Sequence, residues 1–293
     1  MSDSGETLRH RIDGAGDLQA VVRTMKALSA ANISQYERAV HALEVYFHTV
    51  ELGLVACLRQ PDLQLPTTFT HPKAARMTGV IVFGSDQGLV GQFNDLLVEF
   101  VTHALTDLPG DKQVWAVGER MRDRLQDAGL PLAGLFNVPN SVNAITALIG
   151  QLLLATEAAH EHGKLSHLYL FHNRPGAVAG QYEPISQRLL PLDAQWQNHL
   201  LAQPWQTHKL PETLGSSQQT LWALIREYLF VSLYRACAES LASENASRLA
   251  AMQRADKNIG EMLENLTQSY HQQRQDSIDA ELFDVIAGFG NPA

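Results

Sequence analysis

The sequence predicts an α/β protein: a long antiparallel coiled coil of N- and C-terminal helices plus a Rossmann-like α/β domain with a mostly parallel sheet. Three observations predict this fold. Proline is absent before Pro61 and between Pro211 and Pro292, and because a proline inside a helix costs ~3 kcal/mol, both terminal stretches can be helical throughout. Apolar residues recur there at three- and four-residue steps. Between them, short apolar strands alternate with amphipathic helices.

In the N-terminal stretch the apolar positions follow the a and d spacing of a coiled coil. They are Ile33, Tyr36, Val40, Leu43, Phe47, Val50 and Leu54. Upstream, Leu18, Val22 and Met25 keep this spacing with a shifted phase. A single amphipathic helix on a globular core is the alternative interpretation of so short a seam.

The C-terminal stretch favours the coiled coil, because its apolar stripe is narrow and suits one partner helix. The stripe consists of Leu249, Met252, Ile259, Leu263, Leu266 and Tyr270, with Asp256, Gln273 and Ser277 at polar seam positions. As one helix, residues 216–287 would span about 110 Å, whereas a compact chain of this length is about 50 Å across. The helix must therefore break at Gly260 or project, and we expect projection beside the N-terminal helix.

The middle of the chain reads as right-handed βαβ units. Strands are predicted at 80–83, 114–117 and 167–171, and helices at 94–106, 119–128 and 142–162. Pro184 and Pro191 bracket an irregular or edge-strand stretch. The predicted division is an N-terminal shaft helix at 1–60, an α/β base domain at 61–210 and a C-terminal shaft helix at 211–293.

Composition excludes several classes of protein. The 293 residues carry 22 Lys and Arg against 31 Asp and Glu, a net charge of −9, so nucleic acid is not an expected partner. No run approaches ~18 consecutive apolar residues, and the polar start lacks the pattern of a signal peptide. Cys57 and Cys237 are too few for a disulfide framework or a zinc site. We expect a soluble, reduced, cytoplasmic protein.

The loop after the first strand, from Gly84 to Gly91, is the one candidate for phosphate binding. Its spacing, G-x-x-x-G-x-x-G, matches neither dinucleotide nor Walker loops, and it contains Asp86 but no cation. A tight turn that holds a helix against the sheet is the favoured interpretation, and nucleotide binding is the minor alternative. The 12 histidines show no metal-ligand spacing, and no catalytic constellation stands out. We therefore expect no cofactor, no metal and no catalytic residues.

Three separated stretches resemble one family, the gamma subunits of F-type rotary ATP synthases. These stretches are residues 8–12 with 22–30, the loop 85–91 with Asn94, and the C-terminal residues 243–252 with 274–281. The central Leu-Leu-Pro-Leu at 189–192 resembles the family as well. Gln87, Val90, Asp276 and Asp279 depart from the family pattern, and the opening helix is less basic. These departures indicate a divergent branch, for which the alternate bacterial type is a candidate.

The resemblance implies a rotating shaft inside a hexamer of alpha and beta subunits, with a base on the epsilon subunit and the membrane ring of c subunits. It implies a non-catalytic subunit, peripheral at the cytoplasmic face of the bacterial inner membrane, whose shaft avoids a sticky apolar surface. Partner contacts are implied for Met25, Lys26, Arg274, Gln275 and Glu281. Two other functions stay open from the residues alone: a cofactor-binding α/β enzyme that uses the loop 84–91, and a coiled-coil scaffold.

Overall fold

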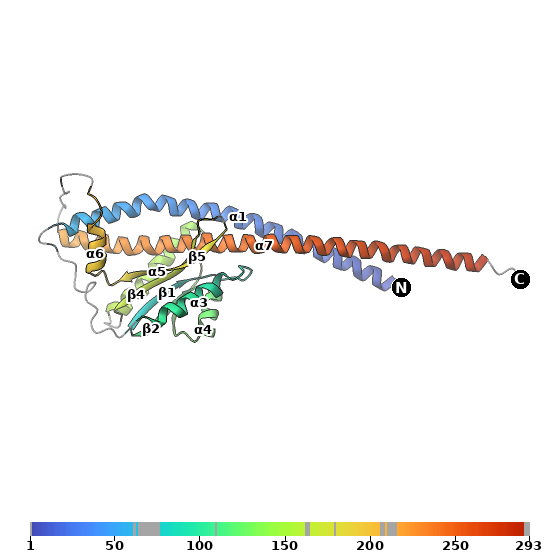
Figure 1. Ribbon diagram of the computed structural model, residues 1–293, viewed down its shortest axis with the longest axis horizontal. Coiled ribbons are helices and arrows are strands. Elements are labelled where there is room, and N and C mark those ends of the chain that lie inside the picture. Colours follow the sequence, from blue (N-terminus) through green and yellow to red (C-terminus); the bar gives the residue numbers. More distant parts are fainter. Residues whose placement is uncertain are drawn as a thin grey trace. The chain divides into compact units, whose positions relative to one another are not determined.

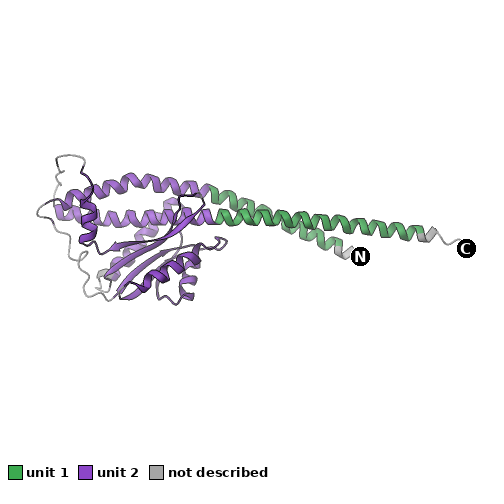
Figure 2. Cartoon of the chain, in the orientation of Figure 1, with its two compact units in different colours: residues 1–30, 248–293 green, residues 31–247 purple. Residues whose placement is uncertain are grey.

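The computed structural model describes residues 2–60, 63, 77–108, 110–161, 165–178, 180–205, 209 and 216–289. The chain divides into two compact units, one of residues 1–30 with 248–293 and one of residues 31–247 (Figure 2). We call them unit 1 and unit 2. The first and last helices, α1 (Ser2–Leu58) and α7 (Ser217–Phe289), each contribute to both units.

Unit 1 is a pair of helical segments, one from each end of the chain. Val22 of α1 is buried with Met252 and Ile259 of α7, and Met25 packs at the edge of this cluster. Gly260 lies in an uninterrupted α7 and faces the side chain of Gln19. Higher residue numbers on one helix thus meet lower numbers on the other, as an antiparallel pair requires.

The two predicted seams are confirmed. Every apolar position from Ile33 to Leu54 and in the C-terminal seam is buried or half-buried, and so are the three polar positions in the C-terminal one. Of the upstream positions, Val22 is buried and Met25 half-buried, but Leu18 is 51% exposed. In unit 2 the same antiparallel pairing brings Asn32 to Asn245 and Tyr46 to Glu227. Period, partner and direction all agree with a coiled coil of the N- and C-terminal helices.

Unit 2 contains a five-stranded sheet of order β3-β2-β1-β4-β5 (Figure 1). The strands are β1 (Met77–Phe83), β2 (Asp111–Val117), β3 (Leu132–Phe136), β4 (His167–Pro175) and β5 (Tyr182–Leu190). The first four pair in parallel and β5 pairs antiparallel to β4. This is the Rossmann-like, mostly parallel sheet that the alternation of elements predicted.

Helices cover both faces of this sheet, and the strands alternate accordingly. The helices between strands are α3 (Phe93–Thr106), α4 (Glu119–Asp127) and α5 (Val142–Glu161), followed by α6 (Ala194–Leu201). Val80 and Val82 of β1 pack with α3 and α4. Ile81 and Phe83 pack on the opposite face in a cluster that includes α1, α5 and α7. The terminal helices are therefore part of the main core of unit 2.

The structure adds two elements that the sequence pattern did not predict. Strand β3 contains Gly134 and is only partly buried, so it lacks the apolar run of a central strand. Helix α6 is short, and its only sequence signal is Asp193, whose carboxylate accepts a hydrogen bond from the backbone N–H of Trp196. Pro184 lies within β5, where an edge strand tolerates the missing N–H.

The sequence predicts no membrane span, but one helix, α5, has the length and apolar composition of one. The segment Val142–Ala159 of α5 is long and apolar enough to cross a membrane by length and composition alone. Its Ile145, Ile149 and Leu152 are fully buried in the unit 2 core, however. A core helix passes the same test of length and composition, so this segment is weak evidence for a membrane span.

Candidate functional site: a paired helical segment and a buried polar seam

Two of the five predicted contact residues lie where α1 meets α7 in unit 1. Met25 is half-buried in the apolar cluster of the pair. Lys26 places its Nζ 2.7 Å from Oδ2 of Asp256, and the Nε of Arg23 lies 3.2 Å from the other oxygen. The hydrogen bond from Lys26, supported by Arg23, lowers the pKa of Asp256. Asp256, a polar position in the C-terminal coiled-coil seam, thus pairs with two cationic side chains of α1.

The other three predicted residues lie farther along α7. Arg274, Gln275 and Glu281 are exposed, and within the described residues the structure gives them no ion pair. At ~1.5 Å per residue, Arg274 lies about 27 Å along the helix from Asp256. The structure therefore places the two groups of predicted contact residues at different levels of unit 1.

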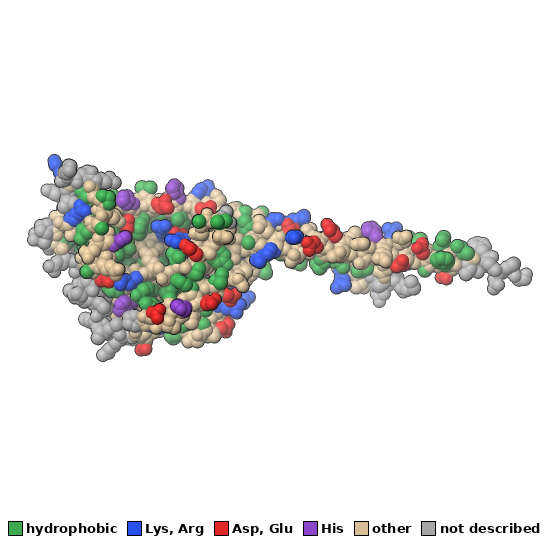
Figure 3. All heavy atoms as spheres, in the orientation of Figure 1, with side chains coloured by type: hydrophobic (Ala, Val, Ile, Leu, Met, Phe, Trp, Pro, Cys, Tyr) green, Lys and Arg blue, Asp and Glu red, His purple; other side chains and the backbone are tan. Residues whose placement is uncertain are grey.

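Next to these residues, α7 exposes apolar side chains that the sequence reasoning missed. They are Ile278, Leu282, Phe283, Val285 and Ile286, and Figure 3 shows hydrophobic side chains gathered beside the described end of α7. This differs from the expectation that a rotating shaft avoids an apolar surface. Exposed apolar clusters mark sites of protein interaction, so this end of α7 is a candidate contact surface.

The loop after β1 is a structural brace. Asp86 accepts hydrogen bonds from the backbone N–H of Glu119 and of Val138, both at 3.0 Å. Asn94 bonds the backbone N–H and the hydroxyl of Ser85 at 3.1 and 2.8 Å. The chain's own carboxylate thus caps the start of α4 and occupies a backbone N–H group of the kind that binds anions at helix starts. The tight-turn interpretation is supported, and Asp86 supplies its physical reason.

The second part of the candidate site is a run of buried polar residues on α7 in unit 2, which we call the polar seam. It consists of Ser232, Glu239, Ser240, Ser243, Glu244, Asn245 and Ser247. Ser240 Oγ donates to the carbonyl of Phe83 at 3.4 Å, and Ser247 Oγ donates to the carbonyl of Val90. Small neighbours such as Ala238 and Ala242 are buried as well. This part of α7 is therefore surrounded by protein and held at a defined rotation.

Glu239 is the centre of the polar seam. Its side chain is 5% exposed, and its two oxygens accept from Nε2 of His172 and from Nε of Arg235, both at 2.8 Å. Burial raises the pKa of Glu239, but the hydrogen bonds from His172 and Arg235 outweigh burial and hold that pKa below its usual value. The carboxylate is ionised and links β4 to α7.

Sequence reasoning used the motif at 243–252 only as a family signature and missed the seam as a structural site. The available signal was a run of small and hydroxyl residues in a long helix, which permits close approach on several sides. Among the residues that the structure describes, no group of three or more His, Cys, Asp or Glu is placed to hold a metal ion.

Fold and site together define a class of protein: a Rossmann-like sheet whose core contains parts of two long, antiparallel terminal helices. A family model described as ATP synthase matches residues 4–290. The ATP synthase gamma chain of Brevibacillus brevis is 26% identical over 292 residues, covering 98% of each chain. A gamma chain of a Polaromonas species is 27% identical, covering 97% of this chain and 98% of the other.

A solved structure has the same fold. A chain from the rotor of the Euglena gracilis mitochondrial ATP synthase, in rotational state 1, aligns with a TM-score of 0.65 at 15% identity, over 95% of this chain and 100% of that chain. The chain belongs to the ATP synthase family that the matching model describes, and the cited relatives that align over nearly its whole length are gamma chains.

Proposed function

We propose that this chain is the central-stalk rotor subunit of an F-type ATP synthase. Its rotation couples ion flow through the membrane ring to ATP synthesis or hydrolysis in the catalytic hexamer. The chain itself is a non-catalytic subunit and transmits torque. The observation that carries the proposal is the match of the ATP synthase family over residues 4–290, together with one uninterrupted α7 from Ser217 to Phe289.

The polar seam supports a mechanical role. A purely apolar helix interface can adjust its register, whereas buried hydrogen bonds with defined partners favour one register. Glu239, Ser240 and Ser247 each bond a group outside α7, either on β4 or in the segment around the loop after β1. Such bonds resist rotation of α7 against the sheet, as a helix that carries torque requires.

The proposed partners follow the family. The alpha and beta subunits surround the paired helices, and the epsilon subunit and the c ring contact the base, which we assign to residues 61–210 between shaft helices at 1–60 and 211–293. We assign contacts with the hexamer to Met25, Lys26, Arg274, Gln275 and Glu281. Lys26 has three donors, so its bond to Asp256 leaves two for a partner. The complex would lie at the cytoplasmic face of the bacterial inner membrane.

Purification of the native complex through an affinity tag on this chain tests the proposal. We expect alpha and beta subunits in threefold excess over the tagged chain, with epsilon and c subunits in the same preparation. Quantitative mass spectrometry gives the stoichiometry, and an untagged strain is the control. Recovery of the chain alone, under conditions that keep the alpha and beta subunits together, would contradict the proposal.

A further inference from the structure

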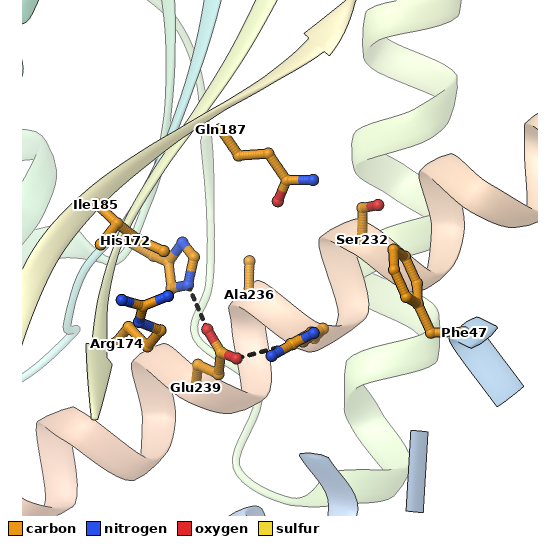
Figure 4. A pocket seen from close by; sticks show the side chains of 9 residues that line it. Phe47, His172, Arg174, Ile185, Gln187, Ser232, Ala236 and Glu239 are labelled. Carbon is orange, nitrogen blue, oxygen red and sulfur yellow. Dashed lines mark hydrogen bonds and ion pairs between the residues drawn. The ribbon is translucent and has the colours of Figure 1, made fainter. Parts of the chain in front are cut away.

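Unit 2 contains a cavity of about 180 Å³ between α7 and the strands β4 and β5 (Figure 4). Its lining includes His172 and Arg174 from β4, Gln187 from β5, and Arg235 and Glu239 from α7. Cationic and hydrogen-bonding side chains therefore reach one small space from both the sheet and the helix. No residue predicted from the sequence as a contact lies in it.

His172 has one bonded and one unbonded ring nitrogen. Its side chain is 2% exposed, and its Nε2 lies 2.8 Å from Oε2 of Glu239. Its Nδ1 is buried and has no hydrogen-bond partner in the part of the chain that the structure describes. In Figure 4 the ring lies on the cavity wall, with Glu239 on one side and Gln187 beyond the other. An unpartnered buried polar atom is costly, so a ligand that bonds Nδ1 would relieve this cost.

The two arginines add donors from opposite walls. Arg174 donates from Nη2 to Glu183, and Arg235 donates from Nε to Glu239. Because a guanidinium carries five N–H groups in a fork, each arginine retains donors for a further acceptor. Their side chains are 47% and 39% exposed, so the cavity is accessible from solvent.

The free groups of the cavity select an acceptor ligand. Both oxygens of Glu239 already accept hydrogen bonds, and the remaining N–H groups of the arginines are donors. Guanidinium forks match the oxygens of phosphate and carboxylate groups. A cavity of about 180 Å³ is smaller than the ~300–1,000 Å³ typical of sites for larger organic ligands, so its size favours a small anion over a nucleotide.

We propose that this cavity binds a small oxyanion of the size of inorganic phosphate, held between Arg174 and Arg235 and bonded by Nδ1 of His172. The Nε2–H of the ring donates to Glu239, and Nδ1 accepts a hydrogen bond from the O–H of a hydrogen phosphate ion. Since Arg174 lies on β4 and Arg235 on α7, the anion joins the sheet to the helix beside the polar seam. Binding therefore strengthens the attachment of α7, independently of the assignment as a rotor.

Thermal unfolding of the full chain in inorganic phosphate, at an ionic strength held constant with sodium chloride, tests the proposal. We expect a saturable rise of the melting temperature in the wild type. Loss of a charge-assisted hydrogen bond weakens binding by about tenfold or more, so Arg174→Gln should require that much more phosphate. Arg235→Lys, which keeps the charge and loses the fork, should show the same shift. Arg226→Gln is the matched control, because Arg226 is 70% exposed and pairs with Glu157.

Histidine-labelled protein provides a second readout by NMR. The ring signals of His172 should shift with phosphate, whereas those of the exposed His41 should not. The proposal is overturned by a melting temperature that does not respond to phosphate. It is also overturned if Arg226→Gln weakens the response as much as Arg174→Gln and Arg235→Lys do, or if the His172 signals stay fixed at saturating phosphate.

Discussion

Glu239 contributes more to the stability of the fold than an acidic residue in a long helix usually does. It is an acidic side chain in the middle of a long helix, where a solvated position is usual, yet it is 5% exposed and holds two donors. Removal of one partner from a buried ion pair leaves the other charges uncompensated. The residue therefore links the sheet and α7 at a buried position, where loss of a hydrogen-bond or ion-pair partner lowers the stability of the fold.

Glu239→Gln should lower the free energy of unfolding by about 3 kcal/mol, because the amide cannot accept from both His172 and Arg235 as a carboxylate does. Urea denaturation followed by circular dichroism measures the change. Glu261→Gln is the control, since Glu261 is 61% exposed and its oxygen is 3.8 Å from Lys257, and it should change stability by less than about 0.5 kcal/mol. Equal effects of the two substitutions would refute the role of Glu239.

The same residue predicts a pH dependence. The pKa of Glu239 is lowered in the folded protein, so its ionised form stabilises the fold above the unfolded pKa of glutamate, about 4.3. That contribution is lost as pH falls through the lower folded pKa. The stability gap between wild type and Glu239→Gln should therefore be constant from about pH 6 to pH 5 and shrink toward pH 3. Denaturation curves at each pH measure it, and a gap that widens on acidification would contradict the assignment.

At the scale of elements, the loop after β1 shows how a motif that resembles a ligand site can be structural. Asp86 uses both carboxylate oxygens on backbone N–H groups of other segments. The loop therefore joins β1 to the start of α4 and to the segment after β3. The presence of Asp86 in this glycine-rich loop is explained by its hydrogen bonds to backbone N–H groups, one of which lies at the start of α4.

Asp86→Ala should destabilise unit 2 by about 1–2 kcal/mol, because the N–H groups of Glu119 and Val138 lose their acceptor. Asp95→Ala is the control, since Asp95 is 49% exposed and pairs with Arg124 on the surface. Denaturant midpoints of the two variants measure the difference. Calorimetric titration with ATP should detect no binding in wild type or variant, and micromolar binding by the wild type would restore the nucleotide interpretation.

The elements that could be predicted are those with a distinct apolar pattern. Helix α3 shows a clear period because it buries one face, whereas strand β1 is a continuous apolar run because both of its faces are buried, and both begin within three residues of the predicted position. Strand β3 could not be predicted, because an edge strand with a glycine has no distinct apolar face. Its place in the sheet comes from pairing with β2, which is a non-local interaction.

At the scale of the whole molecule, the two units differ in what holds them together. The two main clusters of buried apolar residues lie entirely within residues 31–247. Within the described part of unit 1, the structure shows one small apolar cluster and the ion pairs to Asp256. Changes in unit 1 should therefore affect assembly more than the stability of unit 2.

Removal of residues 274–293 should leave the core of unit 2 intact. We expect its melting temperature to change by less than about 2 °C, while recovery of alpha and beta subunits with the truncated chain falls. Calorimetry and co-purification give the two values. A truncated chain that fails to fold would mean that this end of α7 is part of the core.

Arg274→Ala makes a sharper version of that test. Arg274 is exposed, so the isolated chain should keep its melting temperature within about 1 °C, and ATP-driven rotation or complex stability should decrease. Lys257→Ala removes a comparable exposed cation from α7 and should leave both unchanged. An isolated Arg274→Ala chain that unfolds would show an internal role in place of a contact with a partner.

Local periodicity in the sequence determined the two seams and the alternation of strands and helices, because each depends on side chains a few residues apart. The pairing of the two terminal helices was predicted from the length of the C-terminal stretch. Only the tertiary structure determines that Ser240, Glu239 and Ser247 are buried. It alone also places His172 and Arg235 in the lining of the same cavity. These groups lie on elements distant in the sequence. Their burial depends on which face of α7 packs against which face of the sheet, and no local sequence pattern determines that packing.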